Sequence, residues 1–201
     1  FRSSDLEDFK REVIDTRTKK SVTIQNEILR SHQEVEIANF LYLNNIEYEY
    51  EPIYQYNIQY SHKPYTPDFV IYQNGKIAYI EHFGITENGK NDRYSQDELE
   101  QYKKAINDKI KLHKQHDTTL IYTFSVYNDG KPLTEHLQEA LEVKGFELKP
   151  RSNKEVMELL VAGEENRYVR KLINLICRFI SNFKVNGYNA EEFNRMYHST
   201  Q

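Results

Sequence analysis

The stretch that most constrains the fold is residues 65–84, where two runs rich in β-branched residues flank Gln73-Asn74-Gly75-Lys76. Asn-Gly between two such runs is the strongest short-range signal of a β-hairpin. Asp68 stands at the start of the first run and Glu81 at the end of the second. These two ends are neighbours in an antiparallel pair, so the sequence predicts two carboxylates side by side at one end of a buried hairpin.

Two buried carboxylates need a compensating cation, because burying unpaired charge is costly. Mg²⁺ (or Mn²⁺) prefers oxygen ligands, so we expect such an ion between Asp68 and Glu81. For either acid alone, a strand cap or a solvated strand end is the simpler explanation. It is their pairing that favours a metal site.

The same residues resemble the PD-(D/E)XK nuclease superfamily, with Pro67-Asp68 matching its first signature and Glu81 its second acid. The resemblance implies a restriction-endonuclease-like fold and metal-dependent hydrolysis of DNA. The superfamily has a lysine two residues after the second acid, where this chain has Phe83. Several branches supply that cation from the following helix, which makes Lys109 the first candidate catalytic lysine and Lys103 the second. The alternative is that both lysines extend into solvent along the helix border.

Glu34 is the third candidate acid. On a helix it projects on the same face as Ile37, Ala38 and Leu41, and an acid on an apolar stripe is unusual. The superfamily often has a glutamate on the helix before its sheet, where it adds a catalytic metal ligand. The alternative is a glutamate at the helix edge, bonded to a neighbouring backbone group or cation.

Three histidines are weaker candidates for the site. His82 alternates to the other strand face from Glu81. His113 and His116 are spaced for one helix face, but no further ligands of zinc type accompany them.

Periodicity and turn signals predict an α/β fold, with a central mixed β-sheet flanked by helices and with helical extensions at both ends. We expect helices over residues 5–15, 21–43 (with a break near 31–32), 95–116, 133–144, 154–162, 165–184 and 190–197. We expect strands over 46–50, 69–72, 77–80, 119–127 (a central strand) and 146–148. The predicted division is an N-terminal extension over 1–27, a nuclease-like core over 28–149 and a C-terminal extension over 150–201.

Composition limits the possible partners and locations. The net charge of −4 gives no overall basic field, so DNA binding would depend on local patches. The single Cys177 excludes a disulfide framework and fits a reducing cytoplasm, and its apolar helical setting predicts a small core residue. No apolar run is long enough to span a bilayer, so no membrane is expected. The first residue is Phe1, which favours a fragment of a larger protein.

A closer resemblance comes from several segments in order, residues 34–51, 67–69, 79–84 and 112–121. Together they resemble a nuclease-like domain found within bacterial UvrD-type superfamily 1 DNA helicases, over about residues 28–148. The resemblance implies DNA and helicase motor domains, of the same or a partner chain, as partners. The sequence has no Gly-Lys-Ser/Thr phosphate loop, so an ATPase would lie outside it.

Three functions stay open at this point. The first is a metal-dependent DNA nuclease. The second is a catalytically inactive nuclease-fold module that binds or positions DNA for a helicase, which Phe83 and the acidic net charge favour. The third is a protein-interaction module that binds no nucleic acid.

Overall fold

The computed structural model describes residues 3–58, 63–185, 187, 192 and 195, with side chains for those in 7–58, 63–163, 175–185, 187, 192 and 195. The chain divides into two compact units, Phe1–Met157 and Glu158–Gln201. The division falls within α5 (Asn153–Val185), seven residues after the boundary that the sequence predicts at residue 150. The predicted N-terminal extension over 1–27 belongs to the same unit as the sheet.

The first unit is an α/β domain built on a four-stranded mixed sheet, as the sequence predicts. Its strands are β1 (Glu47–Tyr50), β2 (Phe69–Gln73), β3 (Lys76–Thr86) and β4 (Leu120–Val126). The helices of the chain are α1 (Ser3–Thr18), α2 (His32–Leu43), α3 (Gln96–Gln115), α4 (Leu133–Val143) and α5 (Asn153–Val185). The strand order is β1-β2-β3-β4, with β3 and β4 parallel and the other two pairs antiparallel. Helix α3 forms the crossover that a parallel pair requires.

The hairpin of β2 and β3 forms as predicted. Asn74 and Gly75 occupy its turn with φ of 52° and 76°, the positive angles that suit a tight hairpin. Phe69 pairs with Ile80, so the next residue before β2, Asp68, falls opposite Glu81. The register thus brings the two acids to the same end of the hairpin.

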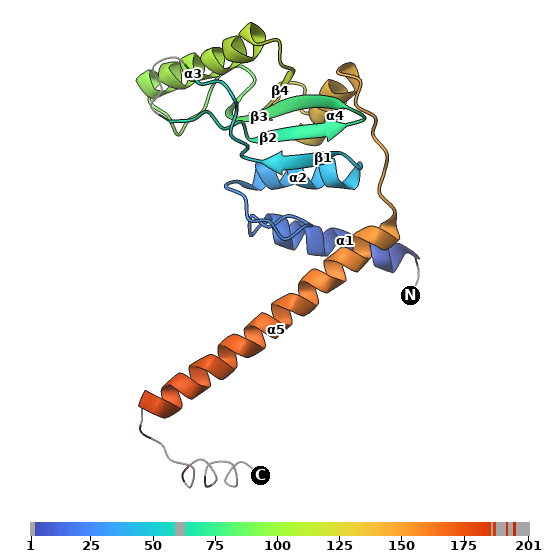
Figure 1. The fold of residues 1–201 in the computed structure, drawn as a ribbon, viewed down its shortest axis with the longest axis vertical. Coiled ribbons are helices and arrows are strands. Elements are labelled where there is room, and N and C mark those ends of the chain that lie inside the picture. Colours follow the sequence, from blue (N-terminus) through green and yellow to red (C-terminus); the bar gives the residue numbers. More distant parts are fainter. Residues whose placement is uncertain (1–2, 59–62, 186, 188–191, 193–194, 196–201) are drawn as a thin grey trace. The chain divides into compact units, whose positions relative to one another are not determined.

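Side-chain alternation gives the sheet two different faces. One face packs against α2 and α4 and forms the main core, which includes Phe69, Ile71, Ala78, Ile80, Ile121, Ile37, Leu41, Leu137 and Leu141. The other face meets α3 through a smaller cluster of Tyr54, Tyr65 and Leu112, with Tyr79 packed against it. The strands accordingly lie between α3 and α2 (Figure 1). Glu81 points to the α3 face, because it alternates with Ile80.

Three predictions about the first unit are wrong. Residues 21–30 are not helical: Val22 and Ile28 form an isolated bridge, and α2 begins only after Ser31, whose Oγ accepts the N–H of Glu34 at 3.1 Å. β4 is an edge strand of the sheet rather than a central one. Residues 146–148 form no strand, because the side chain of Gln73 bonds both backbone groups of Glu147 instead.

The C-terminal predictions also need correction. The helices expected at 154–162 and 165–184 are one continuous helix, α5, and Cys177 is exposed rather than part of a core. The short helix expected at 190–197 lies largely outside the described residues. Within the described part of the chain, no helix combines the length and apolar character that a membrane span requires.

Candidate active site

Asp68 and Glu81 meet at the open end of the hairpin. Both are buried, with 7% and 1% of their surface exposed. The Oδ2 atom of Asp68 accepts the backbone N–H of His82 at 2.6 Å, which fixes the carboxylate against β3 directly beside Glu81. The structure therefore brings the two predicted acids together.

Lys109 joins this pair from α3. Its Nζ lies 2.6 Å from Oε2 of Glu81, and 6.0 Å from the ring centroid of Phe83. The ammonium group thus lies beside Phe83, the residue at the usual lysine position, although it comes from a different element. Lys103, the second candidate, has its side chain against Gly89.

Tyr65 forms a hydrogen bond with the other carboxylate oxygen of Glu81. Its hydroxyl donates to Oε1 at 2.6 Å, so both carboxylate oxygens of Glu81 have a partner. Burial and the charge of Glu81 raise the pKa of Tyr65, which keeps the phenol protonated and able to donate.

Arg30 is the second cation of the site and is held more loosely. Its Nη2 lies 3.3 Å from Oδ1 of Asp68 and 2.7 Å from Oε1 of Glu51. The arginine side chain is 61% exposed, so solvent weakens both contacts. Asp68 therefore lacks a buried cation of its own.

Glu34 lies at the first turn of α2 and is buried. Its Oε2 accepts from the hydroxyl of Tyr50 at 2.7 Å and from the backbone N–H of Arg30 at 3.2 Å. This is the bonded helix-edge arrangement that the sequence left open as the alternative to a metal ligand. Among the described residues there is no group of three or more His, Cys, Asp or Glu that could hold a metal ion.

The electrostatics of the site leave an excess of negative charge. Burial and then the charge of Glu81 raise the pKa of Asp68 to about 7, although the His82 N–H and Lys109 both act to lower it. Glu34 raises it further. Two cations, Arg30 and Lys109, face these three acids.

The oxygen donors of Asp68 and Glu81 are of the type that small divalent cations take. Asp68 and Glu81 offer carboxylate oxygens, and Mg²⁺ is commonly bound by one or two carboxylates together with water. A third acid is therefore not required.

His82 contributes through its backbone only. Its ring points to the α2 face, as the alternation predicts, with Nδ1 2.9 Å from Oγ1 of Thr123 and Nε2 3.1 Å from Oε1 of Gln33. Burial lowers the pKa of His82 to about 4, so the ring is neutral near pH 7.

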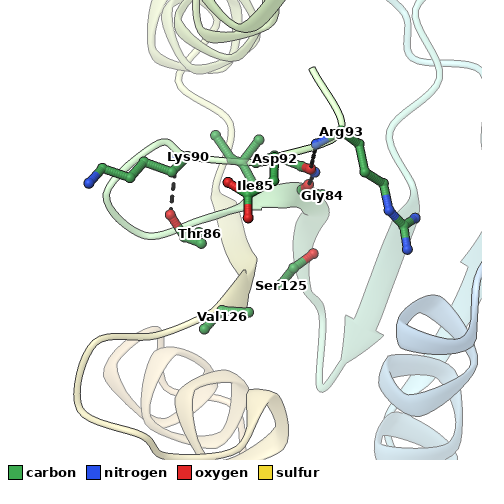
Figure 2. Close-up of a pocket in the computed structure, with 9 residues that line it drawn as sticks. Gly84, Ile85, Thr86, Lys90, Asp92, Arg93, Ser125 and Val126 are labelled. Carbon is green, nitrogen blue, oxygen red and sulfur yellow. Dashed lines mark hydrogen bonds between the residues drawn. The ribbon is translucent and has the colours of Figure 1, made fainter. Parts of the chain in front are cut away.

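A pocket of about 290 Å³ opens further along β3, between the loop after β3 and the end of β4. Asn91 closes the loop onto the strand by donating to the carbonyl oxygen of Gly84 at 2.5 Å. Figure 2 shows the side chains of Lys90 and Arg93 extending from this loop in opposite directions. The hydroxyl of Tyr102 accepts the N–H of Gly84 at 3.1 Å beside the pocket. Burial raises the pKa of Tyr102, and the charges of Asp68 and Glu81 act in the same direction.

Sequence reasoning missed three residues that contact the acids, Arg30, Tyr50 and Tyr65. Arg30 and Tyr65 stand four and three residues before an acid, which is a weak signal because many residues do so. Tyr50 lies in the strand expected over residues 46–50, where alternation accounts for it by itself. Nothing in its spacing indicates that its hydroxyl reaches Glu34.

Comparison with protein-family models, with curated proteins and with solved structures found no match. The interpretation of the site therefore depends on its geometry.

Proposed function

We propose that this chain is a metal-dependent DNA nuclease domain that hydrolyses phosphodiester bonds. The observation that carries the proposal is the ion pair between Lys109 and Glu81, with the buried Asp68 beside it. Two acids and a lysine at the end of a β-hairpin are the set that the PD-(D/E)XK resemblance requires. In this proposal Lys109, carried by α3, supplies the cation that the superfamily has at the position of Phe83.

Each residue has a distinct role in the proposal. Asp68 and Glu81 hold the Mg²⁺ or Mn²⁺, which when bound would activate water and stabilise the charge of the attacked phosphate. Lys109 neutralises charge that develops on the phosphate, because its ammonium group lies next to the carboxylate pair. Glu34 is an outer residue that orients Arg30 and Tyr50.

DNA is the proposed substrate, and helicase motor domains in the cytoplasm are the proposed partners. The resemblance to nuclease-like domains of UvrD-type helicases supports both. Lys90 and Arg93 are exposed in the loop after β3. In this proposal they supply the local positive charge that a chain of net charge −4 needs for DNA.

A second candidate is a nuclease-fold module that binds or positions DNA without cutting it. Two observations favour it. Phe83 stands where the superfamily has its lysine, and both oxygens of Glu81 are already bonded to protein groups. A metal ion would have to compete with Lys109 and Tyr65 for that carboxylate.

Cleavage of labelled single-stranded and branched DNA in Mn²⁺ and in EDTA separates these candidates. The nuclease proposal expects products in Mn²⁺ only, and none with Asp68→Ala. Glu36→Gln is the matched control, because Glu36 lies on α2 outside the acid cluster. This variant should cleave DNA as well as the unaltered chain does. DNA binding without metal-dependent products would select the second candidate. Neither binding nor cleavage would reject both and leave a protein-interaction module.

A further inference from the structure

Glu81 is the end point of a row of hydrogen-bonded side chains between α3 and the sheet. Tyr65 Oη lies 2.6 Å from Oε1 of Glu81 and 3.1 Å from Nε2 of His113. The other ring nitrogen, Nδ1, lies 2.8 Å from Oγ1 of Thr118, which lies 2.5 Å from Oη of Tyr54. Four side chains thus connect Glu81 to a loop more than 25 residues away along the chain.

The direction of each hydrogen bond follows from the number of protons available. Glu81, ion-paired to Lys109, is a carboxylate and only accepts, so Tyr65 donates its single proton to it. The oxygen of Tyr65 can then only accept from His113, so Nε2 carries the imidazole proton. A neutral ring has one N–H, which leaves Nδ1 as the acceptor for the hydroxyl of Thr118.

The surroundings of His113 support a neutral ring. It is 1% exposed, and burial together with the charge of Lys109 lowers its pKa to about 4. The opposite tautomer would put the Nε2 lone pair against the oxygen of Tyr65, which has no second proton to offer. Thr118 could then turn to the carbonyl oxygen of His113, at a longer 3.3 Å, but the contact between the two lone pairs would remain.

Aromatic rings cover the row on the side of Tyr65 and His113, whereas Thr118 is half-buried. The ring of Tyr54 packs against those of Tyr65, Tyr79 and His113, with centroids 5.4, 4.9 and 4.6 Å away. Tyr54 and Tyr65 are themselves buried. Because water cannot easily replace a missing donor here, each member of the row matters to the next.

We propose that Tyr54, Thr118, His113 and Tyr65 are positioning residues that form a one-way chain of hydrogen-bond donors ending on Oε1 of Glu81. The chain holds the Glu81 carboxylate at a fixed angle and keeps Tyr65 on Oε1, so that a metal would meet the carboxylate on the Oε2 side, where Lys109 binds. This catalytic consequence rests on the proposed nuclease function, whereas the donor direction does not. Outer residues of this kind alter metal affinity or activity by about 10- to 100-fold when removed.

The donor direction is tested by ¹H–¹⁵N correlation spectra of the imidazole rings in the full ¹⁵N-labelled chain near pH 7, with His113 assigned through its side-chain carbons. The expected result is a proton on Nε2 and an unprotonated Nδ1. A proton on Nδ1, or on both nitrogens, would overturn the proposal.

The positioning role is tested by Mn²⁺ titration of variants, followed by calorimetry. Tyr65→Phe should weaken Mn²⁺ binding about 10- to 100-fold, as should His113→Met. His113→Gln, whose amide N–H can replace the Nε2 donor, should recover most of the affinity. Tyr56→Phe is the matched control, because Tyr56 stacks on His116 outside the row. Equal losses in the Gln and Met variants would show a merely structural role.

The two tests separate this inference from the nuclease proposal. A chain that binds Mn²⁺ and shows the Nε2 proton but cuts no DNA keeps the donor chain and loses the nuclease. A chain that cuts DNA but carries the proton on Nδ1 keeps the nuclease and loses the donor chain.

Discussion

Asp68 is buried beside a second carboxylate, so its ionisation opposes folding unless a cation is bound. Its pKa of about 7 lies well above the ordinary value near 3.8. The folded chain therefore holds a proton between about pH 4 and pH 7 that the unfolded chain has lost. Folding stability consequently falls as pH rises through this interval and stays low above it.

Asp68→Asn should remove this pH dependence. At pH 8 without metal the variant should be more stable than the unaltered chain, by an amount on the order of 4 kcal/mol at most, since each pKa unit corresponds to about 1.4 kcal/mol. At pH 5 the difference should be much smaller. Urea unfolding in EDTA at both pH values measures it, with the exposed Asp92→Asn as control. A variant less stable than the unaltered chain at pH 8 would contradict the account.

Lys109 affects folding stability in the opposite direction from Asp68, because its positive charge offsets the buried carboxylate of Glu81. Lys109→Met leaves Glu81 buried without its cation, and removing one partner of a buried pair costs about 3–5 kcal/mol, less here because Lys109 is partly exposed. Mn²⁺ should restore part of that stability while DNA cleavage stays at least about 100-fold lower. Thermal unfolding and cleavage assays measure the two effects. Lys104→Met, on the exposed side of α3, should change neither.

At the scale of elements, α3 is what completes the site. As the crossover between the parallel strands β3 and β4, it must run back across the sheet face that carries Glu81. Lys109 and His113 are four residues apart and so share a face of the helix. The first reaches Glu81 directly and the second through Tyr65.

The loop between β3 and α3 is the proposed contact with DNA. Replacing Lys90 and Arg93 together by Ala should weaken DNA binding and reduce the slope of log affinity against log salt by about 1.4–1.8, since each phosphate contact contributes about 0.7–0.9. The charge-matched control is Lys131→Ala with Lys149→Ala, because both lysines are paired with nearby acids. Fluorescence anisotropy at several salt concentrations measures the slope. An unchanged slope would exclude this loop from the DNA interface.

At the scale of the whole molecule, the site belongs to one unit. Every residue assigned to it lies between Arg30 and Thr118, inside the unit Phe1–Met157. The second unit contributes an exposed helix with Leu175, Ile176, Phe179 and Ile180 on its surface.

A chain ending at Met157 should therefore fold and keep the site. We expect cooperative thermal unfolding and the same Mn²⁺-induced rise in Tm as in the full chain, because the sheet and both of its helical layers are retained. Scanning calorimetry with and without Mn²⁺ tests this. Loss of the Mn²⁺ effect in a folded shortened chain would show that the second unit takes part in the site.

The sequence by itself determined the hairpin and the pairing of Asp68 with Glu81, because turn chemistry and strand register are local properties of residues 65–84. It also indicated Lys109, since one helix has only a few lysines near its apolar border. The secondary structure predicted for residues 21–30 and 146–148 was wrong. In both segments a side chain forms a hydrogen bond with a backbone group, and hydrophobic periodicity does not reveal such bonds.

Only the tertiary structure decided which groups surround the acids. Arg30, Tyr50, Tyr65 and His113 come from separate segments, and their contacts depend on how α2, α3 and the loop after β1 pack onto the sheet. Hydrogen bonds and pKa shifts arise from distances in space and from burial, and neither can be calculated from spacing along the chain.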